Sequence, residues 1–184
     1  MQPSQTILTV GHSTHPIDRF LRLLRGGGVR GIADVRRFPG SRRHPQFGAE
    51  ALSASLAASA IHYEPLGEAL GGRRSTRPGV DPSDNSAWRN ASFRAYADHM
   101  GSREFAAGLE RLEALARERR TAIMCAESDP RRCHRQLIAD ALLVRGWSVF
   151  DLLADGGLVR RSLSPHAAIE EGRVSYPGQP TLDL

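Results

Sequence analysis

The sequence predicts a single α/β domain with a mostly parallel central sheet of about five strands and helices on both faces, in the layering of Rossmann and flavodoxin-like folds. Short apolar, β-rich runs alternate along the chain with longer amphipathic runs. With 184 residues, 40% of them hydrophobic, the chain is long enough for one domain with a substantial core and short for two. We place the domain in residues 1–155 and expect residues 156–184, which are rich in glycine, proline and charge, to form a C-terminal surface tail.

Strand and helix signals alternate in the first half of the chain. The strands are short runs rich in apolar and β-branched residues, and Gly11 stops the first one. Pro16 suits the first turn of a helix, whose apolar residues recur at helical spacing until the glycines at 26–28 end it. The expected elements are strands at Thr6–Val10, Gly31–Val35 and Ile61–Leu66, with helices from Pro16 and at Ala49–Ala60.

The second half resumes this alternation after a long loop. Residues 67–90 contain Gly-Gly, Pro-Gly and Asp-Pro pairs, which favour loops, and loops of this length are usually functional or disordered. Ser102 is a plausible N-cap for a helix whose buried stripe includes Phe105 and Leu109. The expected elements are helices at Ala91–Met100, Ser102–Arg119 and Pro130–Arg145, with strands at Thr121–Cys125 and Trp147–Leu153.

This topology predicts a site at one edge of the sheet. Ligands of parallel α/β sheets bind beyond the carboxyl ends of the strands. The loops that leave the first, second and fourth strands carry side chains of the kinds used in catalysis and binding. They are His12 and Ser13, Asp34 and Arg36, and Cys125 and Glu127. We therefore expect three loops that are distant in sequence to meet at this edge.

The densest chemistry lies in residues 124–135, which hold both cysteines of the chain. Asp129 as N-cap and Pro130 at the first helical position would place residues 131–133 in a first turn, where free N–H groups and the helix dipole favour an anion. Cys125 would face this turn, and the dipole and nearby arginines would lower its thiol pKa, as a nucleophile requires. The stretch therefore predicts an anion site beside a reactive thiol.

Each of these residues also has a purely structural interpretation. Cys125 suits a buried position at the end of a central strand, and Cys133 is in phase with the apolar face of the expected helix. Glu127 suits an ion pair with an arginine, either Arg36 or Arg135. Asp34 and Arg36 suit another ion pair, and His134 a hydrogen bond that fixes the loop. Their coincidence at one predicted edge argues for a functional site instead.

The ligand spacing argues against a metal site, and we expect no cofactor. Cysteines of structural zinc sites are normally separated by roughly two to four residues, whereas seven residues separate Cys125 from Cys133. Cys133 and His134, as neighbours on a helix, would also point about 100° apart. A redox pair of the two thiols would need the start of the helix to fold back onto the end of the strand.

The excess of positive charge lies in the first quarter of the chain. All 25 basic residues are arginine, and eight of them fall between Arg19 and Arg43 with a single acid. The remainder carries 17 arginines against 19 acids. A bias of composition explains the choice of arginine, and a solvated helix face explains those near Arg19, but neither explains those around Arg42 so easily. Arginines in that loop suit phosphate groups or a nucleic-acid backbone.

We expect no membrane association, because no apolar run approaches the roughly 20 residues that a span requires. The N-terminus lacks the pattern of a secretory signal, and two cysteines are too few for a disulfide framework. These features favour a cytoplasmic protein with reduced thiols.

Several strings of residues between Thr6 and Leu153 carry a family resemblance. The pair Cys125-Ala126-Glu127 and Cys133-His134-Arg135 is quite specific. The other strings are Gly11-His12-Ser13, Asp34-Val35-Arg36, Ser41-Arg42, Phe47, Leu70-Gly71-Gly72, Phe93 with Tyr96-Ala97, and Pro130. Together they resemble the bacterial and archaeal family called domain of unknown function 488. Because that family has no settled activity, the resemblance implies where a site lies and leaves its reaction open.

Three functions remain open. The first is an enzyme, a cysteine- or carboxylate-dependent hydrolase or transferase, that acts on a phosphate-bearing or nucleotide-like substrate. The others are a nucleic-acid-binding module without catalysis and an interaction domain with a structural polar cluster. The oligomeric state does not follow from the sequence. The expected catalytic residues are Cys125, Glu127, His134 and Asp34, and the expected substrate- or anion-binding residues are His12, Ser13, Arg36, Ser41, Arg42, Arg131, Cys133 and Arg135.

Overall fold

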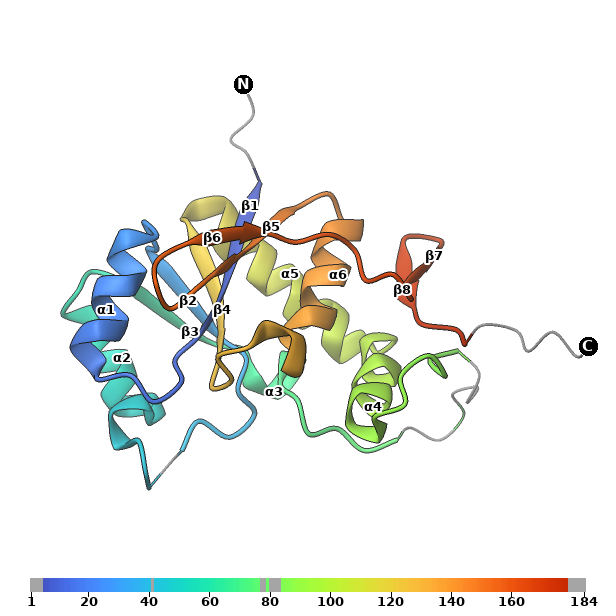
Figure 1. Cartoon of the computed structure of the whole chain (residues 1–184), viewed down its shortest axis with the longest axis horizontal. Helices are drawn as coiled ribbons and strands as arrows, with labels where there is room; N and C mark the ends of the chain where they lie inside the picture. Colours follow the sequence, from blue (N-terminus) through green and yellow to red (C-terminus); the bar gives the residue numbers. More distant parts are fainter. Residues whose placement is uncertain (1–4, 41, 77–78, 80–83, 179–184) are drawn as a thin grey trace, which may run out of the picture.

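A six-stranded sheet forms the centre of the protein (Figure 1). The computed structural model describes residues 5–40, 42–76, 79 and 84–178. The strand order is β3-β2-β4-β1-β5-β6, and all pairs are parallel except that of β5 with β6. The strands are β1 (Thr6–Gly11), β2 (Gly31–Asp34), β3 (His62–Pro65), β4 (Thr121–Cys125), β5 (Ser148–Leu152) and β6 (Leu158–Arg160), and a separate hairpin joins β7 (Ala168–Glu170) to β8 (Arg173–Ser175).

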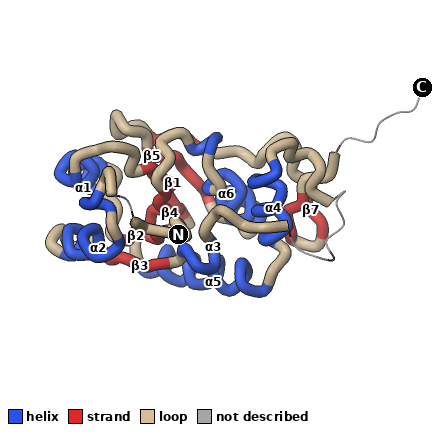
Figure 2. Tube along the Cα trace, turned by 90° about the horizontal axis from the view of Figure 1, so that it is seen from below, coloured by secondary structure: helices blue, strands red, loops and turns tan. Residues whose placement is uncertain are grey.

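Helices cover both faces of the sheet (Figure 2). One face carries α1 (Ile17–Gly26) and α2 (Ala49–Ala57), and the other carries α3 (Gly67–Leu70), α4 (Ala91–Met100), α5 (Arg103–Glu118) and α6 (Arg135–Val144). Two short 3-10 turns are η1 (Pro45–Phe47) and η2 (Pro130–Arg132). No helix in the described part of the chain combines the length and the apolar composition that crossing a bilayer requires.

Alternate strand residues face two separate cores. In β1, Ile7 belongs to the core beneath α5 and α6, whereas Leu8 and Val10 belong to the core beneath α1 and α2. The same alternation in β4 sends Cys125 to the α6 side and Met124 to the opposite side. The alternation therefore decides on which side of the sheet each polar residue at the strand ends lies.

The expected α/β fold, with a mostly parallel sheet and helices on both faces, is confirmed. The segment expected as a surface tail is more closely joined to the domain than its composition indicates. It supplies β6 at the edge of the sheet, and Tyr176 is fully buried with its hydroxyl 2.9 Å from Asp140 Oδ2, to which it donates. The three strands of this segment, β6, β7 and β8, are each only three residues long, which is too short for an alternating pattern of apolar residues to be visible in the sequence.

The helix expected at Pro130–Arg145 is divided in two. Asp129 caps the turn η2 as expected, because its carboxylate accepts the Arg131 N–H at 2.9 Å. The chain then leaves the helical conformation at Cys133, with φ −132° and ψ 147°, and α6 begins only at Arg135. A capping residue and a proline specify a first turn, but they do not specify that the helix continues.

Candidate functional site

A cavity of about 710 Å³ opens at the carboxyl ends of β1, β2 and β4, which are neighbours in the sheet. The three loops that follow these strands line it, as expected. They contribute His12 and Ser13, Arg36, and Cys125 and Glu127. Further lining residues are Gly72 and Arg73 in the loop after α3, and Asn90, Ser92, Phe93 and Tyr96 at the start of α4. Loops distant in sequence therefore meet at one edge, and α4 adds a wall that the strand order alone did not indicate.

Gly11 allows the loops after β1 and β4 to touch. A Cβ atom added at Gly11 would lie 2.0 Å from the Glu127 carbonyl oxygen, which no side chain permits. The pairing of the strands continues into the loops, because the N–H groups of His12 and Ser13 donate to the carbonyls of Cys125 and Ala126, each at 3.0 Å. The absence of a side chain at Gly11 thus fixes the distance between the two loops.

Asp34 and Arg36 form an ion pair on the side of the sheet that faces α2. The carboxylate of Asp34, which is 1% exposed, accepts hydrogen bonds from Arg36 Nε at 2.8 Å, Arg36 Nη2 at 2.6 Å and the Tyr63 hydroxyl at 2.8 Å. Arg36 Nη1 donates in addition to the Phe47 carbonyl at 2.8 Å. The pair therefore corresponds to the structural interpretation, although Arg36 also lines the cavity.

His12 is held in one orientation by this ion pair. Its Nδ1 lies 2.8 Å from the Ser13 carbonyl, which can only accept, so Nδ1 carries the proton and Nε2 accepts from Arg36 Nη1 at 3.1 Å. The ring stacks on Phe47 with 4.0 Å between centroids. Burial, together with the nearby Arg36, lowers the pKa of His12 from 6.5 to about 4, so the imidazole is neutral at pH 7.

Cys125, Cys133 and His134 form a second group, here called the thiol–imidazole cluster, on the side that faces α6. Their ligating atoms all lie within 4.8 Å of one another, and Cys133 Sγ is 3.6 Å from His134 Nδ1. His134 Nε2 donates to the Val35 carbonyl at 3.0 Å. The expected hydrogen bond of His134 that fixes the loop is therefore present, and it leaves Nδ1 unprotonated toward the thiols. All three residues line the cavity.

The pKa of Cys125 is shifted in the direction opposite to that expected. The hydrogen bond from Cys125, followed by the charge of Arg135, lowers the pKa of Cys133 to about 6 against the opposing effect of burial. The same hydrogen bond, together with burial, raises the pKa of Cys125 well above its usual value. The contact between the two sulfur atoms therefore favours the thiolate at Cys133 over that at Cys125.

Arg135 lies behind the cluster and does not line the cavity, contrary to its expected role in anion binding. It is 1% exposed. Its Nε is 3.4 Å from Cys133 Sγ, its Nη1 donates to the Thr9 hydroxyl at 3.3 Å, and its Nη2 donates to the Glu127 carbonyl. These contacts draw Cys133 and the loop after β4 toward the centre of the sheet.

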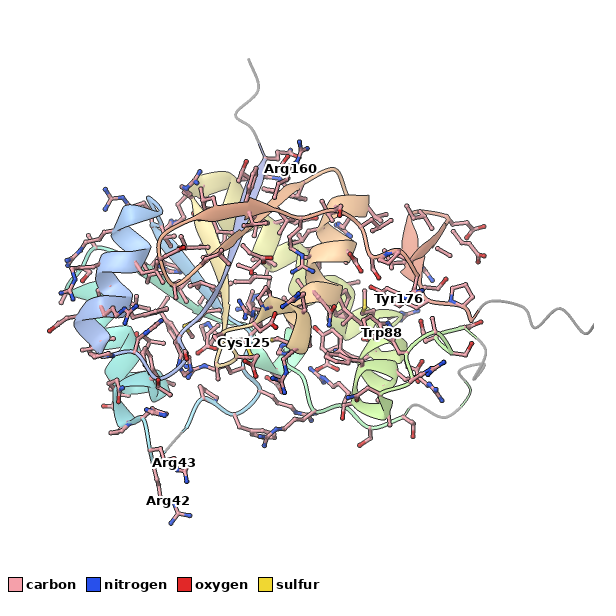
Figure 3. All side chains as sticks on the ribbon, in the orientation of Figure 1. Arg42, Arg43, Trp88, Cys125, Arg160 and Tyr176 are labelled. Carbon is pink, nitrogen blue, oxygen red and sulfur yellow. The ribbon has the colours of Figure 1, made fainter. Side chains whose placement is uncertain are left out.

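Two other expected binding residues, Arg131 and Arg42, are placed differently, and a third cannot be compared. Arg131 is 83% exposed and pairs with Asp129 at 3.1 Å, while its neighbour Arg132 lines the cavity. Arg42 is exposed on a loop directed away from Cys125 (Figure 3) and does not line the cavity. Ser41 lies outside the described residues. Consecutive arginines point in different directions, so composition alone does not identify the one that faces the cavity.

Glu127 lines the cavity with an exposed side chain. The ion pair with Arg36 or Arg135 that sequence suggested does not form, since only the Glu127 backbone carbonyl contacts Arg135. The carboxylate instead accepts the Asp129 N–H at 3.3 Å. It is thus available to a bound molecule.

Tyr96 is a cavity residue to which the sequence assigned no role. Its ring is fully buried, its centroid lies 5.1 Å from that of His134, and its hydroxyl donates to the Leu70 carbonyl at 2.7 Å. It joins α4 to the loop that carries Gly72. The sequence strings around Leu70 and Tyr96 contribute to the family resemblance. They were the only feature of the sequence that could have indicated that these residues form a wall of the cavity.

A profile of the family described as Domain of unknown function DUF488 matches residues 16–142. The matched region extends from the start of α1 into α6 and includes the whole thiol–imidazole cluster. Searches of curated proteins and of solved structures gave no match. Because the profile covers well over half of the sequence, the chain belongs to the DUF488 family.

Proposed function

We propose that the protein is an enzyme that acts on a phosphate-bearing, nucleotide-like substrate in the cavity, with the thiol–imidazole cluster as its reaction centre. The position of the cluster carries this proposal. Two thiols and an imidazole, all within 4.8 Å, line an open cavity at the sheet edge where α/β proteins bind ligands. A volume of about 710 Å³ is within the usual range for small-molecule sites.

The charge of the lining supports an anionic substrate. Arg73 and Arg132 contribute guanidinium groups, which bind phosphate in bidentate fashion. Glu127 is the single carboxylate among the described residues that line the cavity. The hydroxyl groups of Ser13 and Ser92 offer further hydrogen bonds to phosphate oxygens.

The aromatic residues of the lining support a nucleotide. Phe38 is 65% exposed beside the cavity, and Phe93 lines the wall formed by α4. Such rings bind nucleobases by stacking, at about 1–3 kcal/mol per base. Arg37 lies over the Phe38 ring, with 5.6 Å between its Cζ and the centroid, and holds this ring beside the arginines.

Arg132 and Arg131 provide a matched test of substrate binding. We expect Arg132→Ala to weaken the binding of nucleoside monophosphates about tenfold or more, because a charged hydrogen bond contributes roughly 1.5–3 kcal/mol. Arg131→Ala should change affinity less than about twofold, since this side chain is 83% exposed and outside the cavity. Titration calorimetry with nucleoside monophosphates and the matching nucleosides measures both effects. Equal losses in the two variants, or equal affinity for the nucleosides, would refute the proposal.

Turnover tests the reaction centre separately from binding. Incubation with a panel of nucleoside mono-, di- and triphosphates, followed by chromatography, should show a product with the wild-type protein. Cys133→Ser and Glu127→Gln should each lower the rate by about 100-fold or more while nucleotide affinity changes little. Arg131→Ala serves again as the control. Unchanged turnover in both cavity variants would place the chemistry elsewhere.

A further inference from the structure

We propose that Cys125, Cys133 and His134 bind a divalent cation of the zinc class and leave one coordination position open to the cavity. This inference rests on the proposed function, which places the reaction centre at the thiol–imidazole cluster. Within that centre, it makes the two cysteine sulfur atoms metal ligands. Cys133 Sγ and His134 Nδ1 are 3.6 Å apart. On a tetrahedral zinc ion, with Zn–S of about 2.3 Å and Zn–N of about 2.1 Å, sulfur and nitrogen ligands are also about 3.6 Å apart.

The backbone at Cys133 removes both sequence arguments against a metal. One was the spacing of the two cysteines, and the other took Cys133 and His134 as neighbours on a helix, whose side chains diverge. Cys133 is extended instead, and the turn η2 brings it back to the end of β4 beside Cys125. Cys133 and His134 can therefore direct their ligating atoms to one point. The seven residues between the cysteines form the loop that brings Cys133 back beside Cys125.

The imidazole is held in the tautomer that a metal requires. Nε2 of His134 donates to the Val35 carbonyl at 3.0 Å, so its lone pair is on Nδ1, the nitrogen that faces the thiols. Ligating histidines typically donate their second N–H to a carbonyl or carboxylate in this way. His134 is half-buried and packs against Tyr96, whose ring centroid is 5.1 Å away, so its orientation is fixed before any ion binds.

The sulfur of Cys133 lies beside a buried guanidinium group, because Arg135 is only 1% exposed. The Nε of Arg135 is 3.4 Å from Cys133 Sγ. Such donors stabilise thiolates, which are the form of cysteine that binds metals. This contact is independent of the distances between the ligands and favours an anionic sulfur at Cys133.

An open coordination position faces the cavity. The group contains no fourth His, Cys, Asp or Glu among residues 5–40, 42–76, 79 and 84–178. Gly72 lies against His134, where an added Cβ would be 3.0 Å from Nδ1, so the missing side chain keeps this side of the cluster accessible. Three protein ligands with one open position are typical of catalytic zinc, whereas structural zinc has four.

Glu127 is suited to move protons for a metal-bound water. It follows the ligand Cys125 by two residues, lines the cavity and makes no ion pair with an arginine among the residues that the structure describes. The bound water gives a proton to Glu127 and the remaining hydroxide attacks the electrophilic atom of the substrate. The bond to the leaving group breaks with its electron pair, and the leaving group takes the proton, so one water is consumed for each bond cleaved. A Cys2His zinc site with a glutamate that is not a ligand is an established arrangement for such hydrolysis.

Cobalt provides a direct test, because thiolate ligands give Co²⁺ a sulfur-to-metal absorption band and tetrahedral geometry gives intense visible bands. The reduced, chelator-treated protein should bind one equivalent of Co²⁺ with these bands, and Zn²⁺ should displace it.

Cys125→Ser, Cys133→Ser and His134→Ala should each lower the affinity for Co²⁺ at least 100-fold. Gly72→Ala should weaken it by crowding Nδ1. His62→Ala, an exposed histidine of β3 outside the cavity, should bind Co²⁺ like the wild type.

The wild-type titration decides the inference even if a cysteine variant fails to fold. No sulfur-to-cobalt band in the folded, reduced wild-type protein would overturn it, and so would a full band in His134→Ala. Nucleotide binding separates this outcome from the proposed function. If phosphate compounds bind in an Arg132-dependent manner without any metal binding, only the metal inference fails. If Co²⁺ binds with the expected ligands and nucleotides do not bind, the metal inference stands and the proposed substrate class fails.

Discussion

Arg135 connects the candidate site to the interior of the sheet. Beyond its contacts at Cys133 and Glu127, it donates to the Thr9 hydroxyl, which itself donates to Asp151 Oδ1 at 2.6 Å. Asp151 also pairs with Arg161 at 3.2 Å, so the buried positive charge of Arg135 reaches a carboxylate through one hydroxyl. Buried charges require such partners, because leaving one unpaired costs several kcal/mol. The polar chain explains why an arginine at the start of α6 is directed inward.

His12 makes stability depend on pH. Its pKa is lowered from 6.5 to about 4, so protonation is favoured in the unfolded state and resisted in the folded state. The stabilisation is complete above pH 6.5 and is lost as the pH falls toward about 4. It amounts to at most about 3.5 kcal/mol, because each pKa unit corresponds to about 1.4 kcal/mol.

Urea denaturation of the wild type and His12→Gln at several pH values measures this contribution. Subtracting the two curves removes the effect of the carboxyl groups that titrate in the same range. The difference should shrink between pH 6.5 and pH 4. A difference that is independent of pH would show that His12 is not buried in its neutral form.

At the scale of elements, Gly11 determines how closely the loops after β1 and β4 approach. We expect Gly11→Ala to lower the free energy of unfolding by about 2–4 kcal/mol, because the new Cβ would meet the Glu127 carbonyl at 2.0 Å and push the two loops apart. Gly26→Ala is the control. It lies at the end of α1 with no atom within 4 Å of the added Cβ, and should be neutral or slightly stabilising.

Chemical denaturation of the two glycine variants tests this prediction. The affinity for Co²⁺ should fall in Gly11→Ala as well, since the displaced loop carries Cys125 and Glu127. Equal stability of Gly11→Ala and Gly26→Ala would mean that the loops are not in contact.

Local patterns predicted the elements well and the path of the chain between them poorly. Strands and long helices have a periodicity that sequence displays, and the rule for ligands at strand ends correctly joined His12, Arg36 and Cys125 at one edge. The helical conformation is interrupted at Cys133, next to the point where Arg135 turns inward to contact Thr9, a residue remote in sequence that the local pattern does not include. The lowered thiol pKa expected for Cys125 assumed a continuous helix from Pro130, which the chain does not form.

At the scale of the whole molecule, the C-terminal segment completes the core above α6. The amide of Tyr176 donates to the Asp84 carbonyl and that of Ala87 to the Tyr176 carbonyl, both at 3.0 Å. Figure 3 shows Tyr176 beside Trp88, and their ring centroids are 5.4 Å apart. The segment thereby secures the residues just before α4, the helix that forms one wall of the cavity. Composition alone suggested a surface tail, because a single buried aromatic residue is not a periodic pattern.

Replacements of Tyr176 test this role. Tyr176→Ala should lower the free energy of unfolding by about 3–5 kcal/mol through the cavity it leaves. Tyr176→Phe should lower it by about 1–2 kcal/mol, since Asp140 loses a buried donor. Ile169→Ala, at a side chain that is 54% exposed on β7, should cost less than about 0.5 kcal/mol. Guanidinium denaturation measures the free energy of unfolding of the three variants. If Tyr176→Ala were as stable as Ile169→Ala, the C-terminal segment would not contribute to the core.

The strand order also governs when the protein can fold during its synthesis. β1 emerges from the ribosome first, but its two neighbours in the sheet are β4 and β5, and β4 also separates it from β2. A nascent chain that ends before Thr121 therefore holds β1 and β2 without the strand that joins them. At about 5–20 residues per second, this state lasts for several seconds of translation. The strands β1 and β2 can be joined in one sheet only after β4 has been made, and β4 is part of the segment that holds both cysteines. The synthesis of this segment therefore completes both the centre of the sheet and the candidate site.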